Sequence, residues 1–434
     1  MSSSLVPQLP IVGAAHDPAP RVPTDWTTSA MQGRIRRRYA AERRFRLLGL
    51  AAVTLSAGFL AFLLLTMLWQ GAGGFTETRV RLPVDLGAAS LPVTPAQLEG
   101  RGADLALAGA GLAGAVDAAA AQTYGADGAE LLSDGAWLHV RDAIKADPSL
   151  LTRRETFDLP VASPIDVARK GAGTRQAEAV VARLEARGVL SRGLNLGFFI
   201  SADSTDPTRA GVWGAFKGSL LTMLVTLLLA FPVGVLAALY LEEYAPRNRW
   251  TDLIEVSINN LAAVPSIIFG LLGLALFLGT FGLPRSAPLV GGLTLALMTM
   301  PVIVIAGRNA IKAVPPSIRD AALGVGASPV QVVFHHVLPL AMPGILTGTI
   351  IGMARALGET APLLLIGMRA FIAAPPDGVT DPATALPVQI FLWSDQVDRG
   401  FVEKTSAAII ALLVFLLAMN GLAIYLRNRF ETRW

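Results

Sequence analysis

The sequence contains no cysteine and few charged residues. Of its 434 residues, 16% are Asp, Glu, Lys or Arg, whereas 53% are hydrophobic. This composition excludes an ordinary water-soluble domain of this length and indicates a membrane as the solvent. The lack of cysteine excludes disulfide bonds but assigns no redox compartment, since many cytosolic chains are equally poor in cysteine.

Motifs for nucleotide and metal chemistry are also missing. The phosphate-cradling pattern GxxxxGK[ST] does not occur, and the run GAFKGS at 214–219 lacks its spacing. His335 and His336 have no third ligand nearby, so we expect no metal site. An enzyme that acts within the membrane needs paired catalytic groups on different helices, and one arginine and one glutamate in the apolar segments do not supply them. We therefore expect no catalytic residue and no cofactor in this chain.

Six apolar stretches are each long enough to cross a bilayer, which takes about 20 residues. They lie at 47–69, 220–241, 253–278, 289–306, 345–367 and 407–426. The first follows a basic tail and precedes no convincing small-residue cleavage site, so we expect an anchor and not a signal peptide. The expected fold class is an all-α polytopic membrane protein with six transmembrane helices.

Arginines predict the orientation of these spans. Seven of them directly precede the first span: Arg34, Arg36, Arg37, Arg38, Arg43, Arg44 and Arg46. Basic residues favour the cytoplasmic side, so the N-terminus is expected there, and six spans return the C-terminus to the same side. The arginines at span ends also explain the net charge of +4, which makes nucleic-acid binding the weaker interpretation.

A long polar segment between the first two spans is expected outside the cytoplasmic membrane. Apolar alternation predicts strands at 78–82 and 157–161, and helical spacing predicts a helix at 174–187 that ends at Gly188. These elements indicate a small α+β extracytoplasmic domain inserted between transmembrane helices 1 and 2. Its residues contain no metal-ligand cluster or nucleophile constellation that would indicate a function.

We therefore expect five segments: a basic cytoplasmic tail, transmembrane helix 1, the α+β insert, a core of five transmembrane helices, and a cytoplasmic tail. Their bounds are 1–46, 47–70, 71–211, 212–427 and 428–434. The core includes a cytoplasmic loop at 307–340. In this loop, Ser317 is expected to cap a short helix at 318–323, with Asp320 answering three residues later. Ser328 and the proline after it are expected to open a second short helix, and the two helices form an exposed knob.

Three short motifs stand in this loop: Asp320-Ala321-Ala322, Gly326 and Leu338-Pro339. They resemble the EAA loop of ABC-importer permeases, which in that family docks in a cleft of the ATP-binding subunit. The resemblance implies a coupling role for Ile318, Asp320, Ala321, Ala322, Gly326, Leu338 and Pro339. Small alanines permit close approach, and the glycine supplies a turn. Asp320 stands where the family usually has Glu, and an ordinary helical hairpin is the alternative.

Three segments of the core resemble the PstA-type permeases of phosphate importers: YLEEYA at 240–245, VPSIIFG at 264–270 and RALGETAPL at 355–363. The resemblance covers 213–427 and implies a non-enzymatic permease subunit of an ATP-driven phosphate importer in the bacterial inner membrane. The partners implied are a second permease (PstC-like), two ATP-binding subunits (PstB-like) that bind the ATP, and a periplasmic phosphate-binding protein (PstS-like).

Arg355 and Glu359 lie within the apolar fifth span. A charge buried alone in hydrocarbon costs on the order of 3 kcal/mol, so such residues usually serve a function. Their spacing permits an ion pair on one helix face, and a purely structural pair is the alternative. A guanidinium can hold phosphate oxygens in a fork, and the resemblance implies an arginine here in phosphate passage. We expect Arg355, Glu359 and Thr360 to line the substrate pathway.

Other residues of the spans have simpler interpretations. Gly344, Gly348 and Gly352 recur at four-residue spacing, which predicts close packing against another helix. Glu242 and Glu243 stand beside the arginines at 247 and 249, where a solvated, topology-setting cluster is expected.

Two other functions remain open. A permease for another oxyanion, such as sulfate or molybdate, would keep the EAA-like loop but need not keep the segment at 355–363. A membrane sensor would use 71–211 as its receptor, but it needs a cytoplasmic output domain, and only tails and short loops are expected there.

Overall fold

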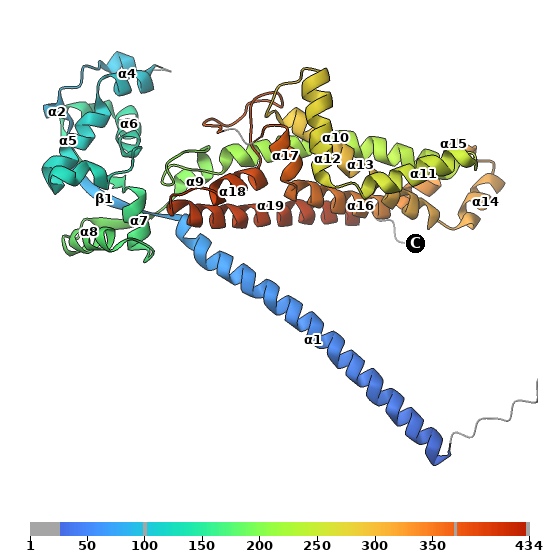
Figure 1. Ribbon diagram of the computed structural model, residues 1–434. Helices are drawn as coiled ribbons and strands as arrows, with labels where there is room; N and C mark the ends of the chain where they lie inside the picture. The colour runs from blue at the N-terminus through green and yellow to red at the C-terminus, as the bar shows by residue number, and fades with distance from the viewer. Residues whose placement is uncertain (1–26, 99–101, 369–370, 431–434) are drawn as a thin grey trace, which may run out of the picture. The chain divides into compact units, whose positions relative to one another are not determined.

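The computed structural model describes residues 27–98, 102–368 and 371–430, which are mostly helical and include one small sheet (Figure 1). The chain forms two compact units, Met1–Leu64 and Leu65–Trp434, and the boundary between them falls within helix α1 (Ser29–Gly74). In the first unit, no described residue of α1 is buried. Its apolar stretch has the length and hydropathy of a membrane span.

Among the residues that the structure describes, five helices are long and apolar enough to cross a membrane. They are α1, α10 with its π-helical end η3 (Trp213–Tyr244), α13 (Pro288–Lys312), the helix Pro329–Gly358, and α19 (Gly400–Phe430). Two bent helix pairs raise the number of candidate spans to as many as seven if each pair counts as one span. The chain is therefore a predominantly helical protein with several candidate spans.

The span predicted at 253–278 is not one straight helix. α11 (Arg249–Ala262) and α12 (Ser266–Gly273), which continues as η4 (Leu274–Thr280), meet at an angle of 100°. Pro265 lies at the break and has extended backbone. Proline has no amide hydrogen and disfavours helical backbone at the residue before it, so the first helix ends ahead of Pro265. An apolar run of sufficient length therefore does not by itself predict a continuous helix.

The helix that corresponds to the span predicted at 345–367 begins and ends earlier in the chain, at Pro329 and Gly358. It consists of α15 (Pro329–Gln331), the π-helical η5 (Val332–Val337) and α16 (Leu338–Gly358). Ser328 caps it through reciprocal hydrogen bonds with Gln331, as the Ser-Pro pair predicts. The prediction of a second short helix in the knob was wrong, because this helix runs on without interruption into the span.

The first helix of the loop is α14 (Pro316–Gly324), and the capping role predicted for Ser317 was wrong. The helix begins at Pro316, two residues before the predicted start at 318, with Pro315 in extended backbone before it and no side chain capping it. Pro316 suits the first turn because that turn needs no amide hydrogen. Gly326, with φ of +92°, then turns the chain, in a conformation that costs glycine little.

A three-stranded antiparallel sheet follows α1, in the order β2-β1-β3. The central strand β1 (Thr76–Asp85) pairs with β2 (Arg154–Pro160) and β3 (Leu190–Leu194), so that Val80 stands opposite Leu159 on one side and opposite Leu190 on the other. The strand predicted at 78–82 lies in β1, and the one predicted at 157–161 overlaps β2. The short, polar β3 had no apolar alternation to predict it.

Helices cover this sheet and complete its core. Val80 and Leu82 of β1 are fully buried beside α5 (Leu112–Tyr124) and α6 (Ala136–Ala146). α8 (Arg175–Ala186) confirms the helix expected at 174–187, and it begins where the Thr174 side chain accepts a hydrogen bond from the Ala177 amide. The remaining short helices are α2 (Leu86–Ala89), α3 (Pro95–Leu98), α4 (Ala103–Gly109), η1 (Ala126–Leu131), η2 (Pro148–Thr152), α7 (Ser163–Arg169), α9 (Leu196–Ile200), α17 (Ala361–Leu365) and α18 (Leu386–Ser394).

α13 packs closely against both α10 (Trp213–Leu239) and α16, because glycines line the contacts. A Cβ added at Gly292 of α13 would lie 2.4 Å from the Cβ of Val225 in α10. One added at Gly348 of α16 would lie 2.1 Å from the Cβ of Ala306 in α13. Small residues at these points let the helix backbones approach.

We expect Gly348→Val to destabilise the core, because two branched methyl groups would have to displace α13. Overpacking of this kind costs roughly 1–3 kcal/mol. The matched control is Gly421→Val in α19, where an added Cβ meets nothing within 4 Å. Thermal unfolding in detergent, followed by tryptophan fluorescence, should give a lower Tm for the first variant only. Equal Tm values for the two variants would contradict this packing.

Candidate functional site

Arg355 and Glu359 lie at the end of α16 and not in the middle of a continuous span. Arg355 Nε is 3.5 Å from Glu359 Oε1, and the two side chains are 50% and 20% exposed. Glu359 has extended backbone just after Gly358, and Thr360 precedes α17. The pair therefore stands at a helix break, where a half-exposed guanidinium still has N–H groups free to face an anion.

The break after α16 lies close to the second interrupted helix, in which α11 and α12 are separated at Pro265. α12 packs against α17, and Gly270 lies so close to Pro362 that a Cβ there would be 2.7 Å from the Pro362 Cα. The segments at 264–270 and 355–363, which are distant in sequence, are thereby adjacent in the structure. Non-helical backbone at membrane depth is tolerated where it is buried in protein or lines a cavity.

The glycine stripe of α16 faces α13. Added Cβ atoms at Gly344, Gly348 and Gly352 would approach Ala310, Ala306 and Thr299 to 2.6, 2.1 and 3.0 Å. These glycines therefore allow close contact between α16, the helix that carries Arg355, and α13.

The residues of the EAA-like loop divide into a buried and an exposed group. Ala322 is buried, and Ile318 and Leu338 are partly buried in the same apolar cluster with α13. The remaining four, Asp320, Ala321, Gly326 and Pro339, are exposed. One face of the loop thus fixes it to the core while the other is free in this chain.

Large apolar side chains accompany the exposed group. Leu323, Val325, Val330 and Phe334 are all exposed, and Val325 is 86% exposed. An apolar patch of this kind on a turn is typical of a surface that binds another protein.

A salt bridge ties α14 to the end of α10. Arg319 Nη2 lies 2.7 Å from Glu243 Oε1, whose side chain is 12% exposed, and Arg319 Nη1 donates to the Val314 carbonyl at 2.7 Å. A partly buried, multiply bonded guanidinium holds its neighbours in a fixed geometry better than an exposed ion pair does. This guanidinium therefore bonds α14 both to the end of α10 and to the residues that precede α14.

A second group of ion pairs joins α13, α11 and the π-helical end of α10. Arg308 of α13 lies 2.7 Å from Glu255 of α11 and 3.3 Å from Glu242, which Lys312 also approaches to 3.6 Å. The expectation that Glu242 and Glu243 form a solvated cluster with the nearby arginines was wrong, because both find partners more than 60 residues away. The sequence did offer one indication of these partners, because Arg308 and Lys312 are spaced four residues apart and so share one face of a helix.

No metal centre accompanies these residues. In the ranges that the structure describes, no three His, Asp or Glu side chains form a group that could hold a metal ion. The groups available to a ligand at the helix break are thus the guanidinium of Arg355 and the carboxylate of Glu359.

Two families match the sequence in separate regions. Residues 230–432 match the family described as binding-protein-dependent transport system inner membrane component. Residues 32–179 match a domain of unknown function, DUF3333. The two matched regions do not overlap, and the first begins within α1 and extends into α8.

Curated relatives match the core. The phosphate transport system permease protein PstA 1 of Mycobacterium tuberculosis (strain H37Rv) is 34% identical over 206 residues, which are 47% of this chain and 66% of that protein. PstA of Haemophilus influenzae is 31% identical over 227 residues, 52% of this chain and 79% of that protein. The probable ABC transporter permease protein YqgI of Bacillus subtilis is 30% identical over 246 residues, 53% and 83% of the two chains.

Among solved structures, a chain from the MetNI methionine ABC transporter in inward-facing conformations has a TM-score of 0.41 and 17% identity, over 51% of this chain and 98% of that one. The match to the mycobacterial relative spans about two thirds of its length, and those to the Haemophilus and Bacillus proteins span more. The chain belongs to the binding-protein-dependent transport system inner membrane components, among the ABC transporter permeases of the PstA type.

Proposed function

We propose that this chain is a transmembrane permease subunit of an ATP-driven importer of inorganic phosphate. The observation that carries the proposal is the half-exposed Arg355, held by Glu359 at a break between two helices, in a core whose relatives are named as phosphate transport permeases. A guanidinium presents paired N–H donors that match phosphate oxygens. Glu359 orients it and keeps the empty site neutral.

The topology proposed with this function has six transmembrane segments. α11 and α12 together make the third segment as a broken span, in addition to the five long helices. The N- and C-termini are cytoplasmic, and the α+β insert at 71–211 lies outside the membrane. The core at 212–427 then carries both Arg355 and the coupling loop.

Energy is proposed to come from separate subunits, since the chain has no phosphate-cradling motif of its own. One of the two ATP-binding subunits docks on the exposed face of this loop, at Ala321 and the apolar patch around Val325, and the other docks on the second permease. Closure of these subunits moves α14, and the bond between Arg319 and Glu243 transmits the movement to α10. The spans then alternate between outward and inward access around Arg355.

The full assembly proposed includes a second, homologous permease and a periplasmic phosphate-binding protein. The second permease supplies the other half of the pathway, and the binding protein delivers phosphate from outside. ATP is the only cofactor required, and it is bound by the partners. The enzymatic step, ATP hydrolysis, is therefore proposed to lie outside this chain.

We expect Arg355→Gln to reduce phosphate uptake about tenfold or more, because a neutral amide loses the charge-assisted hydrogen bonds to the anion. Uptake of radiolabelled phosphate is measured in a deletion strain that expresses each variant. The matched control is Arg285→Gln, an exposed loop arginine of the same core. Sulfate and molybdate are tested as competitors, and uptake that follows either of them would favour the alternative oxyanion permease. Wild-type phosphate uptake by an assembled Arg355 variant would refute the role of the guanidinium.

We expect Ala321→Glu to remove the ATP-binding subunits from the purified complex, because a carboxylate would be buried without a partner in the docked interface. The yield of co-purified ATPase should fall about tenfold. Ala41→Glu, at an exposed position of α1 in the basic tail, is the matched control. Unchanged co-purification with the Ala321 variant would exclude this loop as the docking site.

A further inference from the structure

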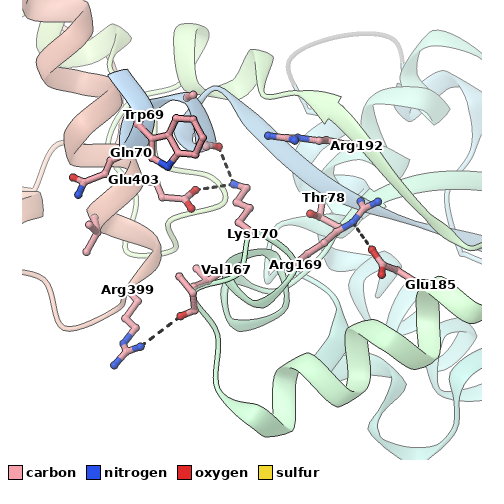
Figure 2. A pocket seen from close by; sticks show the side chains of 14 residues that line it. Trp69, Gln70, Thr78, Val167, Arg169, Lys170, Glu185, Arg192, Arg399 and Glu403 are labelled. Carbon is pink, nitrogen blue, oxygen red and sulfur yellow. Dashed lines mark hydrogen bonds and ion pairs between the residues drawn. The ribbon is translucent and has the colours of Figure 1, made fainter. Parts of the chain in front are cut away.

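A large cavity with several charged side chains lies where the insert meets the start of α19 (Figure 2). Its volume is about 890 Å³, and its walls come from the last residues of α1, from α7, α8 and β3 of the insert, and from the beginning of α19. None of these residues belongs to the helix break or to the coupling loop. The cavity is therefore separate from the site proposed for transport.

Basic side chains outnumber acidic ones around this cavity. The charged lining residues are Arg169, Lys170, Arg192, Arg399, Glu185 and Glu403. Arg169 Nε lies 3.2 Å from Glu185 Oε1, and Lys170 Nζ lies 2.8 Å from Glu403 Oε2. Both carboxylates are thus already paired, and the remaining two positive charges belong to Arg192 and Arg399.

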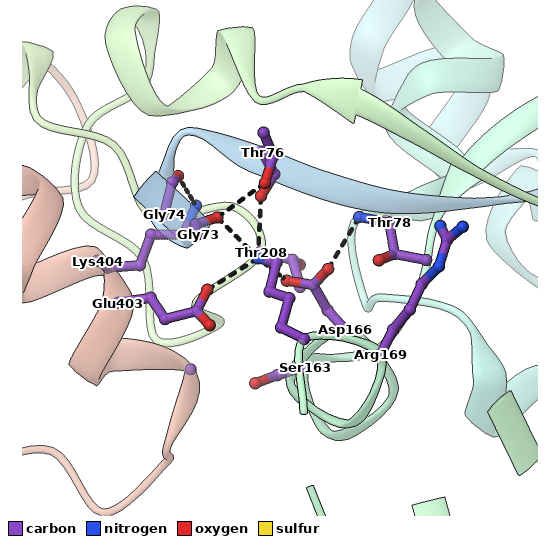
Figure 3. A network of polar contacts seen from close by, with 12 residues as sticks. Gly73, Gly74, Thr76, Thr78, Ser163, Asp166, Arg169, Thr208, Glu403 and Lys404 are labelled. Carbon is purple, nitrogen blue, oxygen red and sulfur yellow. Dashed lines mark hydrogen bonds and ion pairs between the residues drawn. The ribbon is translucent and has the colours of Figure 1, made fainter. Parts of the chain in front are cut away.

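A network of polar contacts that includes Gly73, Thr76, Asp166 and Glu403 (Figure 3) holds the floor of the cavity, and Lys170 bonds to all four of these residues. Its ammonium group contacts Asp166 and Glu403, and it donates to the carbonyls of Gly73 and Thr76 at 2.8 and 3.0 Å. Gly73 has no Cβ, and one placed there would lie 2.6 Å from the Glu403 carboxylate. The floor is therefore a bonded surface that joins α1, the insert and α19, and not a loose gap between them.

The two other arginines have only neutral partners. Arg192 Nη2 donates to Thr76 Oγ1 at 3.0 Å, and Arg399 Nη1 donates to the Ala172 carbonyl at 3.4 Å. Among the described residues, neither guanidinium has a carboxylate within 4.0 Å, and both side chains are exposed. Guanidinium groups that face a cavity without a carboxylate are suited to bind an anion, above all the planar oxygen pairs of phosphate.

We propose that this cavity binds an anion that carries a phosphate group, supplied by an anionic phospholipid headgroup or by free phosphate. Trp69, 88% exposed on the rim, stands at the end of the apolar helix α1, where aromatic side chains meet lipid headgroups. The volume leaves room for a glycerol unit attached to the phosphate. The inference does not depend on what the core transports.

The test uses the full-length chain in a neutral detergent with three probes: dihexanoyl phosphatidylglycerol, the zwitterionic dihexanoyl phosphatidylcholine, and inorganic phosphate. Binding is titrated by the shift in unfolding temperature and by native mass spectrometry. We expect the double variant R192Q/R399Q to bind the preferred anion about tenfold more weakly or worse. R175Q/R183Q, which removes two exposed arginines of α8 outside the cavity, should bind like wild type.

Phosphatidylglycerol binding alone, lost in R192Q/R399Q, assigns the site to a lipid headgroup. Phosphate binding that is lost in the same variant assigns it to the free anion, and both results support the proposal. If the double variant unfolds, Arg399→Gln alone repeats the test, because it removes only one long hydrogen bond. If neither anion binds, or if the two double variants bind equally well, the proposal is overturned.

Discussion

The architecture of the core depends on one constraint: hydrocarbon offers no hydrogen bonds, so a break in a membrane helix must be covered by protein or open to water. Two breaks occur, at Pro265 and after Gly358, and they are brought together by the contact of α12 with α17. α13 supports them because its glycine contacts let α10 and α16 approach closely. The position of Arg355 follows from this arrangement.

Sequence reasoning identified the elements that have strong local signals. Apolar runs located the long helices, alternation located β1, and Thr174 and Ser328 marked helix starts that the structure contains. The motifs at 264–270 and 355–363 also led to the family that the comparisons show. These features are encoded within short windows, where hydrogen bonding and side-chain period act directly.

The sequence predicted contacts between distant residues poorly. Glu242 and Glu243 have arginines a few residues away, yet their partners are Arg308 and Arg319, which only the fold brings near. The effects of two prolines were also missed. Pro265 breaks a span that hydropathy alone presents as continuous. Pro316 begins α14, so that the helix starts before Ser317. In each case tertiary packing or backbone restriction outweighed the local pattern.

The segment at 71–211 is bonded to the start of α19 and to α18 at more than one point. Besides the contact of Lys170 with Glu403, Ser163 bonds to Asp398, and the Trp393 indole donates to Asp203 at 2.8 Å. Contacts this far apart along the chain act together as a clamp. The start of α19 could move away from the sheet only by breaking this ion pair and these hydrogen bonds.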